Sequence, residues 1–173
     1  MKKEFTTALL GYATGLLPSG WETYELIKKS RSALIFRKPP ECPEGLYNFV
    51  CIYPSNKWEE IDAYLGWTKN GSEPSPVISD PRALDFRGAE YELDDFRTSL
   101  GRATGDWTKH YAIVRPDCSL EELEILTLPM EIDQARRLVE PCILKIREDL
   151  EKVADGNYFQ WVDSMRLNPT SQP

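Results

Sequence analysis

The side chains in this sequence that could do chemistry are mainly carboxylates gathered in short stretches. The densest stretch alternates acids with large apolar residues, and its acids are Asp85, Glu90, Glu92, Asp94 and Asp95. Other groups lie at residues 59–62 and 121–124. Paired carboxylates can transfer protons or hold Mg²⁺ or Ca²⁺, but the spacing matches neither an EF-hand loop nor a carboxylate–lysine nuclease arrangement. The pattern therefore favours a solvated acidic face or a docking surface for a basic protein.

Aromatic side chains accompany these acids. Phe86, Tyr91 and Phe96 lie within the densest stretch, and Trp58 and Trp107 each stand beside an acid. Steering charge combined with aromatic anchors is typical of protein interfaces. In the alternative interpretation, the aromatic residues pack inward and only the acids face out. The predicted partner-binding residues are Asp85, Glu90, Tyr91, Glu92, Asp94, Asp95, Trp58, Glu59, Glu60 and Trp107.

His110 is the one histidine, which excludes a site built from several histidines. It lies in a predicted strand with no recognisable nucleophile motif, so a structural role is favoured over catalysis. The sequence has no phosphate-binding glycine motif, and residues 101–105 are better interpreted as a turn. We therefore expect no metal, no cofactor and no catalytic site.

The four cysteines form no C-x-x-C pair and lack the spacing of a zinc site. Cys51 and Cys142 fall inside apolar patterns. In a reducing compartment such residues stay as thiols and pack as small apolar groups.

The net charge of −7 is unevenly distributed along the chain. Residues 1–40 hold seven Lys or Arg and three Glu, a net charge of +4, so residues 41–173 carry −11. A surface this negative repels nucleic acid and anionic membranes and attracts basic proteins. The sequence also contains no apolar run long enough to cross a bilayer and no signal peptide pattern, which favours the cytoplasm.

The first half of the chain predicts a helix followed by a strand-rich region. Apolar spacing predicts the helix over residues 3–17, and alternation predicts the strands. The strands are expected over residues 21–27, 32–37, 46–53 and 60–67. Short connections favour an antiparallel meander, and Tyr47, Phe49, Cys51 and Tyr53 should share one face of the third strand.

The second half is irregular and then helical. Residues 68–82 should form a loop, 83–100 short helical turns, 110–114 a strand and 158–167 a last short helix. Ser119 and Glu122 form a capping box that predicts a short helix beginning at Leu120. The clearest pattern is a helical apolar stripe over residues 132–153, made by Ile132, Ala135, Val139, Ile143, Ile146, Leu150 and Val153. Pro141 lies on its polar side and should kink or split the helix.

These elements predict an α+β fold, in which a mostly antiparallel meander sheet is packed by an N-terminal helix and a C-terminal amphipathic helix. The length suits one domain over residues 1–167 with a flexible tail at 168–173. In size, acidity, tryptophan content and order of elements the chain resembles small bacterial proteins of uncharacterised families that include immunity proteins of polymorphic toxins. The resemblance implies a non-catalytic inhibitor of a basic nuclease or other toxin, and it assigns a role to no residue.

Three alternatives stay open at this point. The chain could be a phage-encoded inhibitor of a host defence complex. It could be a small enzyme or ligand-binding domain with a cleft around His110, Asp94 and a tyrosine. It could also be a structural subunit whose partner covers exposed apolar area.

Overall fold

The computed structural model describes residues 2–43, 45–55, 59–75, 95–104, 109, 111–113, 119–120 and 128–155. The described helices and strands, in chain order, are α1 (Lys3–Gly11), β1 (Glu25–Ser30), β2 (Ala33–Lys38), β3 (Tyr47–Pro54), β4 (Glu60–Thr68), β5 (Asp95–Ser99), α2 (Leu100–Ala103), β6 (Tyr111–Ala112) and α4 (Ile132–Asp155).

The strands form one antiparallel sheet in the order β1-β2-β3-β4-β5, and the short β6 also pairs with β4. β6 lies against the start of β4, where Ile61 pairs with Tyr111, and β5 lies against its end, where Trp67 pairs with Phe96. From β1 to β4, consecutive strands are neighbours because their connections are short, whereas β5 pairs with β4 after a connection that runs from residue 69 to residue 94. The predicted α+β fold with an antiparallel meander is confirmed.

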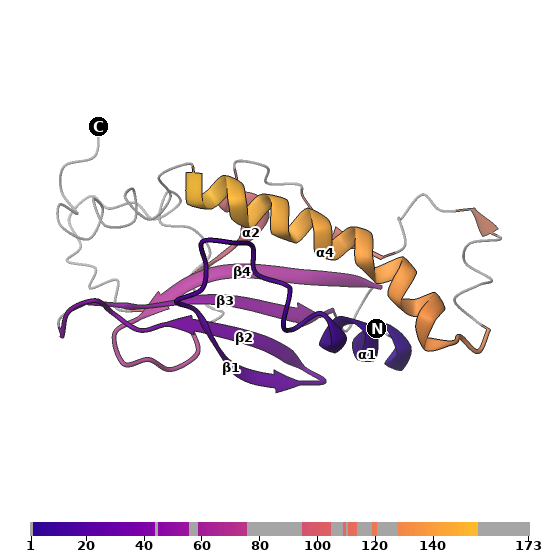
Figure 1. Cartoon of the computed structure of the whole chain (residues 1–173), viewed down its shortest axis with the longest axis horizontal. Helices are drawn as coiled ribbons and strands as arrows, with labels where there is room; N and C mark the ends of the chain where they lie inside the picture. Colours follow the sequence, from indigo (N-terminus) through magenta and orange to yellow (C-terminus); the bar gives the residue numbers. More distant parts are fainter. Residues whose placement is uncertain are drawn as a thin grey trace.

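The main core lies between one face of the sheet and the helices. Val50 and Ile52 of β3 contribute to it from the sheet, and Phe5 and Leu9 contribute from α1. The predicted stripe of α4 is buried in the same core from Ala135 to Val153. Figure 1 shows α4 lying along this face of the sheet with α1 beneath one end. The apolar stripe therefore positions the helix as the sequence predicted.

The opposite face of the sheet is also covered. Phe49 and Cys51 are buried there beneath Tyr47, Tyr53 and Tyr64. The guanidinium of Arg97 stacks 5.3 Å from the Tyr53 ring and 4.5 Å from the Tyr64 ring. Arg37 stacks in the same way over Tyr47, at 5.3 Å. The predicted assignment of alternate β3 residues to two buried faces is confirmed.

Cys51 and Cys142 are buried free thiols, as predicted, and Cys42 is an exposed one. Burial raises the pKa of Cys51 to about 12 and that of Cys142 to about 11. Both thiols therefore stay protonated at neutral pH and pack as apolar groups.

Several predicted boundaries are wrong. The first helix ends at Gly11, and residues 12–17 form turns, because Gly11 and Gly15 weaken the helix. The first strand begins at Glu25, because residues 21–24 turn and bury Trp21.

The second half also departs from expectation. Residues 95–99 form β5 rather than helical turns, because pairing with β4 overrides the local pattern. Pro141 does not split α4, which is continuous around that exposed position. The predictions for residues 76–94, 114–118, 121–127 and 156–173 lie outside the described residues. No helix in the described part of the chain is both long and apolar enough to span a membrane.

Candidate binding pocket

A pocket lies at the end of the sheet where β1 begins and β2 finishes. One wall comes from residues 20–24, which lead into β1. Gly20 has a φ of 94°, a conformation that favours glycine. The amide of Tyr24 then donates a 3.0 Å hydrogen bond to the carbonyl of Trp21. This turn brings the two rings together, with centroids 4.8 Å apart and planes tilted by 41°.

The other wall comes from the connection between β2 and β3. Pro39 and Pro40 end β2 because proline cannot continue the ladder of hydrogen bonds. A tight turn follows, in which the Gly45 amide donates a 2.9 Å hydrogen bond to the Cys42 carbonyl. A Cβ atom at Gly45 would lie 2.7 Å from Cβ of Pro40, so a larger residue would force the turn open.

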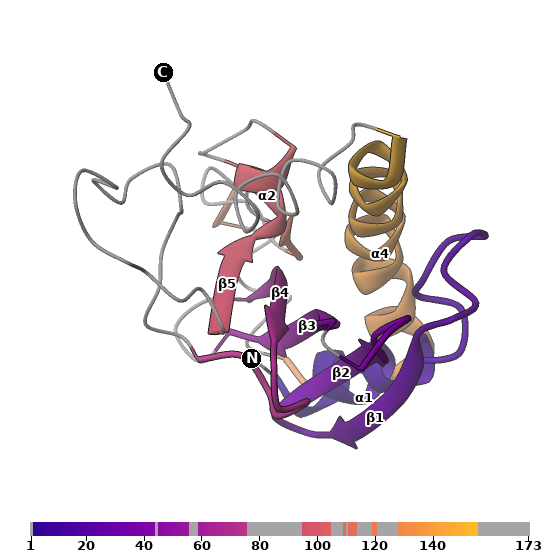
Figure 2. The same ribbon diagram turned by 90° about the vertical axis from the view of Figure 1, so that its left-hand side faces the viewer.

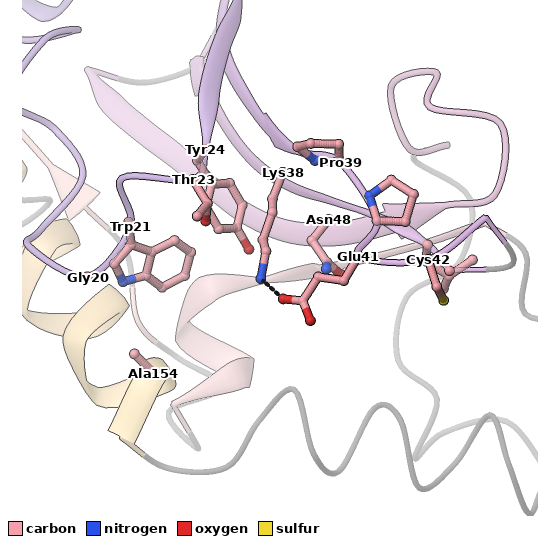
Figure 3. Close-up of a pocket in the computed structure, with 13 residues that line it drawn as sticks. Gly20, Trp21, Thr23, Tyr24, Lys38, Pro39, Glu41, Cys42, Asn48 and Ala154 are labelled. Carbon is pink, nitrogen blue, oxygen red and sulfur yellow. Dashed lines mark hydrogen bonds and ion pairs between the residues drawn. The ribbon is translucent and has the colours of Figure 1, made fainter.

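The pocket between these walls has a volume of about 410 Å³, within the range of sites for small ligands or anchoring side chains. Figure 3 shows Trp21 and Tyr24 at one end, Cys42 toward the other, and Lys38 between them. Asn48 contributes from β3, where it pairs with Lys38. Ala154 contributes from the last turn of α4, so the pocket draws on segments far apart in the sequence.

Among the described residues that line the pocket, the charged side chains form one ion pair. Lys38 Nζ lies 2.8 Å from Oε1 of Glu41, and the two side chains are 27% and 84% exposed. The hydrogen bond from Lys38 lowers the pKa of Glu41. Burial raises the pKa of Tyr24, whose hydroxyl is therefore neutral at physiological pH. The pocket offers one ammonium, one solvent-facing carboxylate and an aromatic wall.

Two exposed apolar side chains follow the pocket residue Tyr24 along β1. Leu26 and Ile27 are each 41% exposed, at the edge of the sheet. Leu26 pairs with Phe36, which faces the same side of the sheet as Lys38 two residues later. Leu26 therefore lies on the same side of the sheet as the pocket, two residues after Tyr24. We call Leu26, Ile27 and the pocket the β1 surface.

The described part of the chain brings no three His, Cys, Asp or Glu side chains together as metal ligands. The pocket itself is lined by a thiol, a carboxylate and an ammonium, and the carboxylate and the ammonium form an ion pair. This arrangement can bind a ligand group by charge, hydrogen bonding and ring contacts.

Only three of the predicted partner-binding residues lie in the described part of the chain. Both carboxylate oxygens of Glu59 accept hydrogen bonds from the backbone amide of Lys2, at 3.1 and 3.0 Å. Glu60 begins β4 and is half-buried, and the backbone of Asp95 begins β5 opposite Thr68. The structure therefore places Glu59 in contact with the start of α1. Asp85, Glu90, Tyr91, Glu92, Asp94, Trp58 and Trp107 lie outside the described residues.

The predicted cleft around His110 and Asp94 also falls outside them, but both neighbours of His110 are described. The Tyr111 hydroxyl and the Lys109 ammonium both bind Asp149, a fully buried carboxylate on α4. Sequence reasoning missed this cluster. A signal was present, because Asp149 follows Cys142 by two helical turns and so falls on the buried side of the stripe.

Sequence reasoning also missed the pocket. Its residues come from turns and strand ends rather than from one motif. Comparisons with protein-family models, with curated proteins and with solved structures find no match to this chain.

Proposed function

We propose that this chain is a non-catalytic protein-binding protein of the inhibitor or immunity type, and that the β1 surface contacts its partner. The observation that carries the proposal is that a pocket lined by Trp21 and Tyr24 lies on the same side of the sheet as Leu26, an exposed aliphatic side chain two residues after Tyr24. Trp and Tyr are enriched among residues that dominate binding energy, and the contacts around them exclude water.

Side chains, rather than the backbone of β1, should make this contact. β1 is an edge strand, but its register with β2 shifts between Leu26 and Lys28. It also carries Lys28 and Lys29, and such bulges and lysines discourage the addition of another strand. The partner should therefore dock on Leu26 and enter the pocket without extending the sheet.

The overall charge suits a basic partner. The chain has a net charge of −7, and the excess negative charge follows residue 40. In the proposal this charge accelerates encounter with a basic toxin or nuclease, and short-range contacts then fix the complex. The acid-rich stretch at residues 85–96 supplies the steering, and the β1 surface supplies an anchor.

The experiment compares two apolar-to-acid substitutions at similarly exposed positions. Leu26 is 41% exposed beside the pocket, and Leu144 is 51% exposed on α4. Tagged wild type, Leu26→Asp and Leu144→Asp would be used to purify partners from the native host. Each captured protein would be identified, purified and tested for direct binding and for toxicity that the chain relieves. The proposal expects Leu26→Asp alone to lose a directly binding protein.

Equal retention of every direct binder by both variants would contradict a role for the β1 surface. Size-exclusion chromatography of the isolated chain supplies a second check. If the wild type dimerises and Leu26→Asp is monomeric, the β1 surface joins two copies of this chain and the proposed partner is wrong.

A further inference from the structure

We infer that the pocket binds the terminal carboxylate of an aromatic residue of the partner, through Lys38, in the place that Glu41 occupies in the free protein. The inference rests on the proposed function, because the partner supplies the group. It adds the chemistry of the anchor, which the proposed function leaves open.

The positive charge of Lys38 favours a negatively charged ligand. Among the described residues that line the pocket it is the one cation, and its side chain is mostly enclosed. It extends from the last position of β2, a place fixed by pairing with Asn48 of β3. A ligand that enters the pocket therefore meets an ammonium held by the sheet, and an anion is the complementary group.

Glu41 serves as an internal substitute for that anion. Its side chain is 84% exposed and belongs to the turn after Pro40, while Lys38 is 27% exposed. Such a surface ion pair contributes little net stability, because water competes with it and the two side chains lose freedom. An arriving carboxylate can take its place on Lys38 at small cost, and Glu41 then returns to water.

The remaining walls select the body of the ligand. Trp21, Tyr24 and Lys38 line the same pocket (Figure 3), so a group bound to Lys38 can place its attached side chain against the aromatic wall. Thr23 and Asn48 add hydroxyl and amide groups. A single ammonium balances one negative charge, which favours a carboxylate over a phosphate dianion. An aromatic residue at a chain terminus has this combination of groups.

The test uses N-acetyl-phenylalanine as the carboxylate probe and N-acetyl-phenylalaninamide as its neutral control. Both would be titrated into the ¹⁵N-labelled protein and followed by heteronuclear NMR. We expect the acid to shift the Trp21 indole signal and the amides of residues 20–24 and 38–48. The neutral amide should bind at least about tenfold more weakly, because it loses a charge-assisted hydrogen bond.

Two substitutions give opposite expected effects. Lys38→Gln should weaken the binding of N-acetyl-phenylalanine by about tenfold or more, because the same charge-assisted hydrogen bond is lost. Glu41→Gln should tighten the binding of N-acetyl-phenylalanine about two- to fivefold, because the Glu41 carboxylate no longer competes for Lys38. Asp133→Asn is the matched control, since Asp133 forms an exposed pair with Arg136 at the other end of α4, roughly 30 Å along the helix from Ala154. Asp133→Asn should leave the binding of N-acetyl-phenylalanine unchanged.

Equal binding of acid and amide, weaker binding by Glu41→Gln, or shifts away from the pocket would overturn the inference. Dispersed spectra of each variant show that it is folded. A further arm tests the source of the carboxylate, because saturating N-acetyl-phenylalanine should weaken binding of the purified partner. If it binds the pocket and leaves partner binding unchanged, the partner does not supply the group.

These results are separable from the test of the proposed function. Loss of the partner by Leu26→Asp without binding of N-acetyl-phenylalanine would leave the proposed function standing and remove the carboxylate site. If N-acetyl-phenylalanine binds but Leu26→Asp loses no partner, the carboxylate site stands and the role of the β1 surface in partner binding is removed.

Discussion

The Tyr111 hydroxyl donates a 2.8 Å hydrogen bond to Oδ2 of Asp149, a carboxylate of α4 with no exposed surface. Lys109 approaches the same carboxylate at 2.6 and 2.7 Å, and Lys152 at 3.2 Å. Since Tyr111 also pairs with Ile61 of β4, the cluster ties α4 to the sheet at β6. Figure 2 shows α4 standing over one face of the sheet that contains β4.

Asp149→Asn should destabilise the protein by about 2–4 kcal/mol, because it removes the negative charge that compensates two ammonium groups near a buried position. Asp133→Asn breaks an exposed pair on the same helix and should cost less than about 0.5 kcal/mol. Urea denaturation followed by circular dichroism measures both free energies of unfolding. Equal stability of the two variants would show that the cluster contributes nothing.

The contribution of Asp149 should depend on pH in a defined direction. Burial alone would raise its pKa, but hydrogen bonds from Lys109, Tyr111 and Lys152 hold the pKa below its ordinary value. A lowered pKa stabilises the folded state above the unfolded pKa of about 4, and this stabilisation is lost as the pH falls through the folded pKa. The difference in the free energy of unfolding between wild type and Asp149→Asn should therefore be constant above about pH 5 and become smaller below about pH 4. A gap that widens in acid would contradict the assigned ionisation.

The cysteines should differ sharply in reactivity. Cys42 is exposed beside the pocket, while Cys51 and Cys142 are buried with raised pKa values. Thiolate is the reactive form, so a maleimide should label Cys42 in the native protein and reach the other two only after unfolding. Mass spectrometry of peptides after timed labelling measures this order. Native labelling of Cys51 as fast as that of Cys42 would show that the sheet face over Cys51 opens readily.

The elements with strong periodicity could be predicted from the sequence, and the rest depended on distant partners. Alternation around Phe49 and Cys51 located β3 and both of its faces, because each face meets a different apolar layer. The α4 stripe was equally clear. β5 was missed because its strand state comes from pairing with β4, about 30 residues earlier, and no local pattern records that pairing.

The site was harder to predict than the fold for a physical reason. Trp21 looks like a strand residue in a sequence window, yet a turn at Gly20 places it across from Lys38. Asp149 was passed over because acids in an amphipathic helix usually face water. A pocket made from turns and strand ends becomes visible only when those ends are brought together in space.

The acid-rich stretch predicted from the sequence can be tested by charge reversal. Asp94→Lys with Asp95→Lys should slow association with the basic partner, and more strongly at low salt, because steering is screened by ions. Glu140→Lys with Glu148→Lys changes the net charge equally on the exposed side of α4. Stopped-flow or biosensor association rates at two salt concentrations distinguish the pairs. Equal slowing by both would assign the effect to net charge and remove any special role of Asp94 and Asp95.

The most direct test of the β1 surface is hydrogen–deuterium exchange of the free chain and of its complex with the purified partner. A bound protein that enters the pocket orders the turns around it and slows exchange of their amides. We expect slower exchange in residues 20–27 and 38–46, with no change in residues 132–140 of α4. Protection confined to other segments, with residues 20–27 and 38–46 unchanged, would contradict the proposal that the partner binds there.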